Sequence, residues 1–500
     1  MNHKNTFVAC ILALTFFSSL QAQSIKVSES HTFTKSYFSQ IIGMDSNQRI
    51  YSIFHGAELE LGISDPGMRT LIKRIPVDLN YKDQKERVQY VTSYFHKGTI
   101  RLIGMILTEN SLRFMKQILD QNGALLQDWT EITGFTASAK TMEVSWNTAL
   151  SENYRFGAIW ISYTRPHDKK CYFKLIQLNE DLEVIWENFY EHPFDRYSTR
   201  QENLKIDRYG NIYIVLSQYT EHYDLRSALM ATTRAIYLKS LLVFNSLDGR
   251  MHVRQLEKEN HLLDHLNLFF DEQNVYLSGF SSRIEDTWDR FTGFALASFP
   301  IKDTGTVHFK FIPFGEEIKG SQVYLKEDSG TKTSFYTRHR IVLQGMGTIY
   351  VSEYEYGSTS GTGSRTIVLL CVDNLGNVIW QKTIERNMLV PGNYGGYALL
   401  FDGKHFGIVF ADHVKNFVDG NRVANENIKL IHNLKFGCAT IAIIDISGNI
   451  SYRQLWKYKE SGKTSLISQH YRVNDLKQLA FETELKGKDK CFIFLQFEEK

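Results

Sequence analysis

One short pattern recurs eight times along the chain, and it constrains the fold more than any other feature of the sequence. Each copy is a turn followed by a β-rich run, usually with an aromatic residue near its start. The copies are QRIYSIF at 48–54, GTIRLIG at 98–104, GAIWISY at 157–163, GNIYIVL at 210–216, QNVYLSG at 273–279, GTIYVSE at 347–353, HFGIVFA at 405–411 and KCFIFLQ at 490–496. Because repetition of this kind is the signature of repeat architectures, we expect one strand unit used many times.

A second pattern follows most copies of the first. An apolar run ends in a polar turn, and a new run begins with an aromatic or apolar residue four positions after the turn glycine. The clearest case is IVLLCVDNLGNVIWQKT, with Gly376 and Trp380. The others pair Gly448 with Tyr452, Gly249 with Val253 and Gly305 with Phe309, while Leu182 replaces the glycine before Trp186 and residues 118–129 are a looser copy. Asp or Asn beside Gly between alternating runs predicts a hairpin.

One further strand precedes each first pattern, so the repeated unit is a four-stranded meander. Such a meander cannot bury both of its faces alone, and stacking copies around an axis solves this problem. A β-sandwich or jelly roll would not need eight similar copies, and a solenoid would show shorter and more regular repeats. The sequence therefore predicts an all-β chain folded as a β-propeller.

The two ends of the chain are expected to complete the ring. The tail from Asn474 resembles an inner and a second strand, and SIKVSESHTF near the start resembles an outer strand without its own sheet. Pairing them would remove an exposed sheet edge. This arrangement gives eight blades. Seven is the alternative, because the first repeat has a weak outer strand around Val77–Val88.

The first 22 residues are expected to be a signal peptide. Lys4 precedes an apolar run, Phe7–Phe17, which is too short to span a membrane. Residues 23–500 are then one propeller domain, located in a periplasm or outside the cell, with no transmembrane segment. The 57 basic and 55 acidic residues give a net charge of +2, so there is no basic excess for nucleic acid.

The four cysteines of the predicted mature chain all lie inside apolar runs. They are Cys171, Cys371, Cys438 and Cys491. Buried free thiols are the expected state, with a Cys438–Cys491 disulfide as the alternative that export permits. His261 and His265 have helical metal-ligand spacing but lack the accompanying glutamate of zinc proteases, so we expect solvated loop histidines. The sequence predicts neither a metal nor another cofactor.

The segment from Asp373 to Trp380, together with Asp445–Tyr452 and Asn179–Trp186, resembles the outer-strand repeat of quinoprotein-like (PQQ-repeat-like) eight-bladed propellers. That group includes quinone-dependent dehydrogenases and non-catalytic envelope assembly proteins. The resemblance extends at repeat level over most of residues 40–495. The chain has no vicinal cysteine pair and no mappable set of cofactor ligands, so the resemblance implies the fold and no active site.

In a ring of such meanders, the tight turns share one face and the longer segments share the other. We expect function on the face of the longer segments, because binding residues concentrate on loops held by a rigid frame. These segments are His55–Gly67, Thr164–Lys170, Phe189–Asn203, Gln218–Lys239, Ser281–Arg290, Pro313–Thr337, Glu353–Arg365, Asn387–Tyr397, Ala411–Gly437 and Tyr458–Asp475.

Polar and aromatic residues cluster in three of these segments. Arginine and tyrosine near aspartate can hold a carboxylate or a sugar, and solvated loop charge is the alternative interpretation. The candidate binding residues are Arg165, His167, Asp168, His192, Arg196, Tyr197, Arg283, Asp286, Trp288 and Arg290. None has the spacing of a nucleophile and its base. The glycine-rich Gly357–Arg365 lacks the lysine of a phosphate-binding loop and predicts a hairpin tip.

The leading functional hypothesis is an exported, non-enzymatic β-propeller that binds a protein or glycan partner, or acts as a scaffold, in the cell envelope. One alternative is a propeller enzyme, a hydrolase, lyase or quinone-type oxidoreductase with its site in the central funnel, by analogy of fold alone. Another is a carbohydrate-binding protein, in which Trp288, Tyr394 and Tyr397 would stack on sugars.

Overall fold

The three-dimensional structure is a computed structural model of the 500-residue chain. It describes residues 25–29, 38–47, 49–56, 58–65, 71–81, 86–108, 111–136, 144–164, 170–195, 199–219, 237–257, 261–283, 291–303, 305–321, 333–343, 347–358, 361–386, 397–401, 406–424, 427–429, 431, 436–461, 471–474, 478–484 and 490–497. The predicted signal peptide lies outside these residues.

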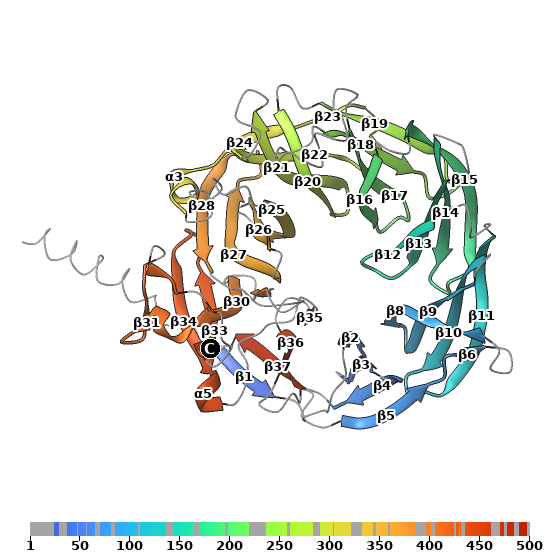
Figure 1. The fold of residues 1–500 in the computed structure, drawn as a ribbon, viewed down its shortest axis with the longest axis horizontal. Coiled ribbons are helices and arrows are strands. Elements are labelled where there is room, and N and C mark those ends of the chain that lie inside the picture. Colours follow the sequence, from blue (N-terminus) through green and yellow to red (C-terminus); the bar gives the residue numbers. More distant parts are fainter. Residues whose placement is uncertain are drawn as a thin grey trace, which may run out of the picture.

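Seven consecutive antiparallel meanders of four strands make up most of the described chain. Figure 1 shows their sheets side by side in a ring, with the first strand of each meander nearest the centre and the fourth at the circumference. The predicted all-β propeller of four-stranded sheets is therefore confirmed.

The first four meanders occupy residues 38–257. Their strands are β2 (Phe38–Met44), β3 (Ile50–His55), β4 (Leu59–Ser64) and β5 (Leu71–Val77); β8 (Gln89–His96), β9 (Thr99–Leu107), β10 (Ser111–Asp120) and β11 (Leu125–Thr136); β12 (Val144–Leu150), β13 (Phe156–Thr164), β14 (Lys170–Asn179) and β15 (Val184–Asp195); and β16 (Thr199–Ile206), β17 (Ile212–Tyr219), β18 (Tyr237–Phe244) and β19 (Met251–Glu257).

The remaining three meanders occupy residues 261–457. Their strands are β20 (His261–Phe270), β21 (Asn274–Arg283), β22 (Gly293–Pro300) and β24 (Lys310–Pro313); β25 (Thr333–Leu343), β26 (Gly347–Ser358), β27 (Gly361–Val372) and β28 (Val378–Glu385); and β29 (Tyr397–Phe401), β30 (Phe406–His413), β33 (Gly437–Ile444) and β34 (Ile450–Lys457).

Several short strands and helices lie outside the seven meanders. The strand β23 (Val307–His308) pairs in parallel with the outer edge of β19, and two small hairpins are separate from the meanders. The short elements are β6 (Asn80–Tyr81), β7 (Glu86–Arg87), α3 (Glu316–Lys319), η3 (Val414–Asn416), β31 (Phe417–Val418), β32 (Asn421–Arg422) and α5 (Tyr458–Ser461). No helix among the described residues is long and apolar enough to span a membrane.

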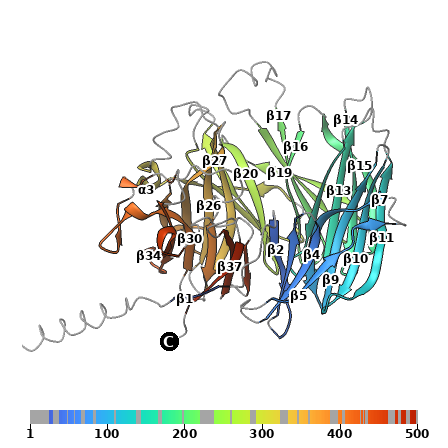
Figure 2. The same cartoon turned by 60° about the horizontal axis from the view of Figure 1, so that its bottom comes forward.

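The two ends of the chain meet in one further four-stranded sheet. Its strands are β35 (Tyr471–Asn474), β36 (Gln478–Glu484), β37 (Lys490–Phe497) and β1 (Ile25–Glu29). β1 lies beside β37 in Figures 1 and 2, and the two are antiparallel from Ile25 opposite Phe497 to Glu29 opposite Ile493. The tail thus supplies three strands to this sheet, whereas the sequence predicted two.

Apolar side chains fill the spaces between neighbouring sheets. Alternate positions of each strand face opposite neighbours, so one strand serves two cores. In β17, Ile212 and Ile214 pack toward the preceding meander, while Tyr213 and Val215 pack toward the following one. A further cluster joins the meander β29–β34 to Ile493 and Leu495 of β37. Stacking the sheets around an axis is therefore what buries both faces of each.

In two meanders, the second sequence pattern fixes how the outer strand docks on the next sheet. The indole Nε1 of Trp380 donates to the carbonyl oxygen of Ile446, 3.2 Å away in the following meander, and Trp186 does the same to Ser246 at 3.1 Å. Leu182 occupies the glycine position before Trp186 with a positive φ of 58°, so its backbone keeps the turn conformation that the pattern predicts.

Gly448 is the position where this docking requires glycine. Its φ is +81°, and an added Cβ would lie 2.8 Å from ring atoms of Trp380. Gly420, in the β31–β32 hairpin, has the same φ with nothing within 4 Å. We expect Gly420→Ala to cost about 1–2 kcal/mol for the left-handed backbone alone. Gly448→Ala should cost about 1–3 kcal/mol more from overpacking. Urea-unfolding midpoints of both variants test this, and equal losses would contradict the packing argument.

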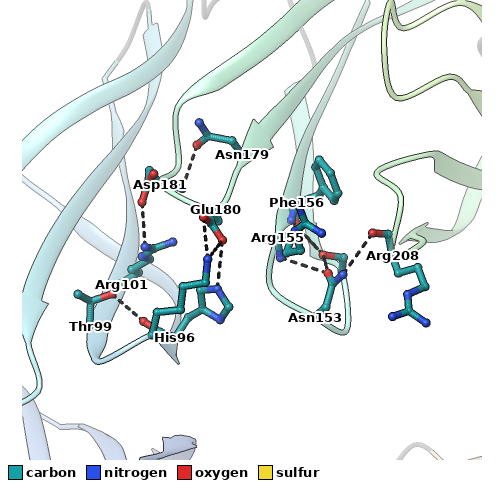
Figure 3. A network of polar contacts seen from close by, with 12 residues as sticks. His96, Thr99, Arg101, Asn153, Arg155, Phe156, Asn179, Glu180, Asp181 and Arg208 are labelled. Carbon is teal, nitrogen blue, oxygen red and sulfur yellow. Dashed lines mark hydrogen bonds and ion pairs between the residues drawn. The ribbon is translucent and has the colours of Figure 1, made fainter.

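The tight-turn face is held together by contacts between turns of neighbouring meanders (Figure 3). Lys97 in the β8–β9 turn donates to Glu180 in the β14–β15 turn at 2.7 Å, and Arg101 pairs with Asp181 at 2.9 Å. Asn153 donates to the carbonyl oxygen of Arg208, one meander further on, at 3.2 Å. Polar groups on this face therefore connect meander to meander.

Candidate functional site

Two of the ten predicted binding residues lie in described parts of the chain. His192 is in the outer strand β15, where it is buried against the edge of the Phe173 ring. The prediction of an exposed loop histidine is wrong there, because β15 continues to Asp195. Arg283 is the last residue of β21, opposite His261. The other eight lie outside the described residues: Arg165, His167, Asp168, Arg196, Tyr197, Asp286, Trp288 and Arg290.

Several predicted long segments are shorter than expected. His55–Gly67 contains the whole of β4, and Glu353–Arg365 is mostly the hairpin of β26 and β27. Ser358 stands opposite Gly361 at its tip, which confirms the hairpin predicted for the glycine-rich stretch. His261 and His265 are wrongly predicted as loop residues, since both belong to β20. His261 stacks on Phe311, with ring centroids 3.7 Å apart.

The described cysteine side chains settle one alternative. Cys371 and Cys438 are buried free thiols, so the Cys438–Cys491 disulfide is wrong. Burial raises the pKa of both thiols to about 11, which keeps them protonated.

A different set of residues stands out on the first strands of the meanders, which together form the inner wall of the ring. Among the described residues, five of these strands carry a β-bulge in their pairing with the second strand. A bulge inserts one residue and re-aims the neighbouring side chains, and bulges are common beside functional sites. In β25 the bulge lies between Thr337 and His339, and in β20 between Asp264 and Asn267. His265, inside the β20 bulge, has a positive φ of 48°.

Amide side chains at two of these bulges connect three strands of the inner wall. Asn203 of β16 donates to the Oδ1 of Asn267 at 2.6 Å, and Asn267 donates to the carbonyl oxygen of Thr337 at 2.7 Å. The hydroxyl of Thr337 lies 3.1 Å from those of both Ser278 and Ser352. Because most of these groups are buried and mutually bonded, this side of the wall is a rigid platform.

A buried ion network lies in the meander β25–β28. Glu353 of β26 is 1% exposed and accepts from Arg338, 2.7 Å away at the β25 bulge. It also accepts from Arg386, whose side chain is 0% exposed. Buried charges of this kind are stable only when paired, so the Glu353 carboxylate is the shared partner of both guanidinium groups.

A second buried pair adjoins the first. Arg422 of β32 donates to Asp412 at 2.6 Å and to the backbone oxygen of Glu385 at 2.6 Å. Its guanidinium carbon lies 4.7 Å from the ring centre of Tyr452. The Glu385 carboxylate accepts from Thr366 at 2.9 Å. We name the six charged residues of this region the stem cluster, namely Arg338, Glu353, Glu385, Arg386, Asp412 and Arg422.

The stem cluster lies where two long segments leave the frame. Arg386 directly precedes residues 387–396, and Asp412 stands just before η3, which opens the segment leading to β33. Three guanidinium groups face three carboxylates, so the cluster is electrically balanced. Such an arrangement fixes the ends of β28 and β30 in one geometry, which is the support that a binding site beside them needs.

Two histidines, His192 and His339, have strongly lowered pKa values. Burial lowers the pKa of His192 to about 4, and burial with the nearby Arg338 does the same for His339, whose ring lies 5.7 Å from that of Tyr397. Both imidazoles are therefore neutral near pH 7. Among the described residues, no group of three or more His, Cys, Asp or Glu is placed to hold a metal ion.

The buried histidines predict a loss of stability on acidification. An unfolded histidine titrates near pH 6.5, so between about pH 6.5 and pH 4 the unfolded chain binds protons that His192 and His339 do not bind in the fold. The melting temperature should therefore fall as the pH is lowered through this window. His192→Gln should flatten the dependence, and His308→Gln, at an exposed position, should leave it unchanged. A parallel decrease in all three proteins would contradict this.

Comparison with known proteins gives the chain no family. No family model and no curated protein matches it. Among solved structures, it is similar to prolyl oligopeptidase B from Galerina marginata, with a TM-score of 0.40 and 11% identity over 96% of this chain, which spans 58% of that protein. It is also similar to an apocarotenoid oxygenase from Synechocystis, with a TM-score of 0.33 and 10% identity over 69% of this chain and 71% of that protein. A third similar structure is an ulvan lyase of a polysaccharide lyase family, with a TM-score of 0.34 and 9% identity over 67% of this chain and 79% of that protein. Likenesses this distant carry no argument about activity.

Proposed function

We propose that this chain is an exported, non-enzymatic binding propeller of the cell envelope, and that it holds a protein or glycan partner on the face of its longer segments. The observation that carries the proposal is the stem cluster. Its buried, balanced charges hold the end of β28, which precedes residues 387–396, and the start of the segment after β30 on a rigid frame. The tight-turn face differs, because its polar groups connect one meander to the next.

The charges of the stem cluster support binding better than acid–base chemistry. A general acid or base must exchange its proton during a reaction, and its pKa is tuned for that task. Glu353 and Asp412 instead each accept from buried arginines and balance their charge, which is a structural role. The sugar-stacking alternative loses one of its three aromatic residues, since Tyr397 is buried.

Site-specific photo-crosslinking in the producing cells tests which face binds. A crosslinker at position 394 is expected to capture a defined partner, and one at Leu375, an 82% exposed tight-turn residue, is not. The captured partner should then bind the purified mature chain and lose that binding when 387–396 is replaced by a glycine–serine linker. Capture only from position 375, or turnover of a small substrate by the purified chain, would refute the proposal.

Export is tested separately by the N-terminus of the natural protein. A chain recovered from the periplasm or medium should begin at residue 23 or 24, after removal of the leader. Retention of residues 1–22 on a cytoplasmic chain would contradict this part of the proposal. The quinoprotein-like resemblance remains a prediction from the repeat alone.

We also propose that the sheet of β1 and β35–β37 serves as an eighth blade and closes the ring. Its support is the five-residue pairing of β1 with β37 and the packing of Ile493 and Leu495 against the meander β29–β34. Closure of this kind holds the two chain ends together and leaves no gap in the frame that carries the binding face.

A further inference from the structure

The fourth strand of each meander is the outer edge of its sheet. Such an edge presents a row of backbone N–H and C=O groups that can pair with another strand, and proteins usually block it with a covering segment, a bulge, proline, lysine or a short strand. Two of these edges are covered by other parts of this chain. β23 pairs with β19, and α3 lies against β28, where the N–H of Thr383 donates to Glu317 at 2.9 Å.

Four further outer strands carry protection of their own. β24 has only four residues and ends at Pro313. β5 contains Lys73, Arg74 and Pro76. β11 and β34 have bulges in their pairing with the third strand, and β34 also exposes Arg453. Each of these four edges therefore has a feature that opposes pairing with a further strand.

β15, the outer strand of the third meander, lacks these features. It has 12 residues, and Trp186–Glu191 pairs with β14 without a register shift, because both irregularities of this ladder lie nearer its ends. This stretch contains no proline, lysine or arginine. Within the described part of the chain, β14 is the only strand paired with β15, and no other segment forms a backbone hydrogen bond with Val184–Glu191. Its outer row of backbone groups is therefore open to a further strand.

Exposed apolar side chains border this open edge on one face of β15. Ile185 and Phe189 lie on this face, and Phe189 is 61% exposed. On the opposite face, Asn188 donates to the carbonyl oxygen of Asp248 at 3.2 Å, in the turn that also accepts from Trp186. These contacts hold β15 in place without using its edge, so the edge is preorganised for pairing.

The charges on the same face indicate which strand the edge fits. Glu187 and Glu191 alternate with Ile185 and Phe189, and their side chains are 42% and 51% exposed although each pairs with a lysine of β14. Opposite charges on neighbouring strands attract, and like charges repel. A partner strand that alternates apolar and basic side chains therefore complements this face, whereas a second copy of β15 would bring two further carboxylates to it.

We propose that the outer edge of β15 binds an extended segment of a partner protein as a fifth strand, with apolar and basic side chains alternating on the face that meets Ile185 and Phe189. The backbone of the partner supplies the hydrogen bonds, and its side chains supply the selectivity. β23 shows that an outer strand of this propeller accepts a further strand, since Val307 and His308 pair with the edge of β19. The site lies on the circumference of the ring (Figure 1) and does not depend on the proposed function.

Fluorescence anisotropy of the mature chain tests this site. The probe is a labelled nine-residue peptide in which threonine alternates with lysine and valine in turn, and it should bind at one site per chain. Phe189→Lys should weaken binding about tenfold, because it removes an apolar contact and places a lysine at the edge. Ile379→Lys is the matched control, since Ile379 is exposed on β28, whose edge is covered. This control should bind the peptide like the wild type.

Two further measurements distinguish strand pairing from other kinds of binding. The same peptide with a methyl group on every backbone nitrogen cannot donate backbone hydrogen bonds, so it should not bind. No binding to the wild type, or equal binding of the methylated peptide or by Phe189→Lys, would overturn the proposal. Sedimentation equilibrium of the chain alone should show a monomer. A dimer that Phe189→Lys dissociates would assign the edge to a second copy and overturn the proposal as well. These assays do not involve position 394, so they can fail while the crosslinking there succeeds, and the reverse also holds.

Discussion

Replacing Glu353 with glutamine is expected to lower the free energy of unfolding by about 3–5 kcal/mol, because it removes one partner of a buried ion network. The Arg386 guanidinium is 0% exposed and pairs with Glu353, and Arg338 pairs with the same carboxylate. A neutral amide of the same shape keeps the packing but removes the negative charge that both cations contact. The loss therefore measures the charge of Glu353 rather than its volume.

Urea unfolding of the mature chain measures this loss, with Glu272→Gln as the matched control. Glu272 pairs with Arg208 at 2.6 Å, but both side chains are well exposed, at 77% and 46%. Exposed pairs contribute about 0–1 kcal/mol, so the control should unfold close to the wild type. If the two variants unfold at the same urea concentration, the stem cluster does not stabilise the loop bases as we infer. Glu353→Gln should also weaken partner capture from position 394, since the stem of that loop is no longer fixed.

The fold could be predicted from the sequence because every blade repeats the same local chemistry. Seven of the eight copies of the first pattern lie on the second strand of a meander, from QRIYSIF on β3 to HFGIVFA on β30. The exception, KCFIFLQ, lies on β37, with β36 on one side and β1 on the other. Turn residues such as Gly376 and Gly448 take the positive φ that their patterns predict. Local periodicity and turn chemistry suffice for an architecture whose unit is short.

The candidate site could not be predicted in the same way, because its residues are distant in sequence. Arg338, Glu353 and Arg386 meet only when the strands of one meander pair, and Asp412 and Arg422 join them only when the next meander stacks beside it. Each alone resembles an ordinary strand or loop charge. A usable signal was nevertheless present at Asp412, which directly follows the apolar run of β30. A charge in such a run requires a buried partner.

The prediction that His261 and His265 lie in a loop was wrong for a related reason. The HLLDH stretch does not alternate strictly, because the bulge between Asp264 and Asn267 shifts the pattern within β20. A bulge depends on the neighbouring strand as well as on its own sequence, so the pattern suggested a loop where a distorted strand exists. Asn267 and His265 therefore belong to the inner wall, although the sequence placed function only on the longer segments.

Deleting residues 23–29 from the mature chain is expected to destabilise the propeller by several kcal/mol. The deletion removes β1, and with it the whole ladder from Ile25 opposite Phe497 to Glu29 opposite Ile493. A backbone hydrogen bond contributes about 1 kcal/mol net, and lost packing adds to that sum. The outer edge of β37 would then be exposed as a template for other strands, so we expect a lower melting temperature together with oligomers.

Adding the missing strand back as a peptide distinguishes the loss of ring closure from a general effect of shortening the chain. A synthetic peptide of residues 24–30 added to the shortened chain should restore the melting temperature, because the missing strand can pair in trans as it does in the intact chain. A peptide of the same composition in scrambled order is the control, since it keeps the charge and loses the alternation along β1. Calorimetry and light scattering report the two effects. A shortened chain that melts like the intact one would mean that seven meanders hold the ring without β1, and that the sheet of the chain ends is an appendage rather than an eighth blade.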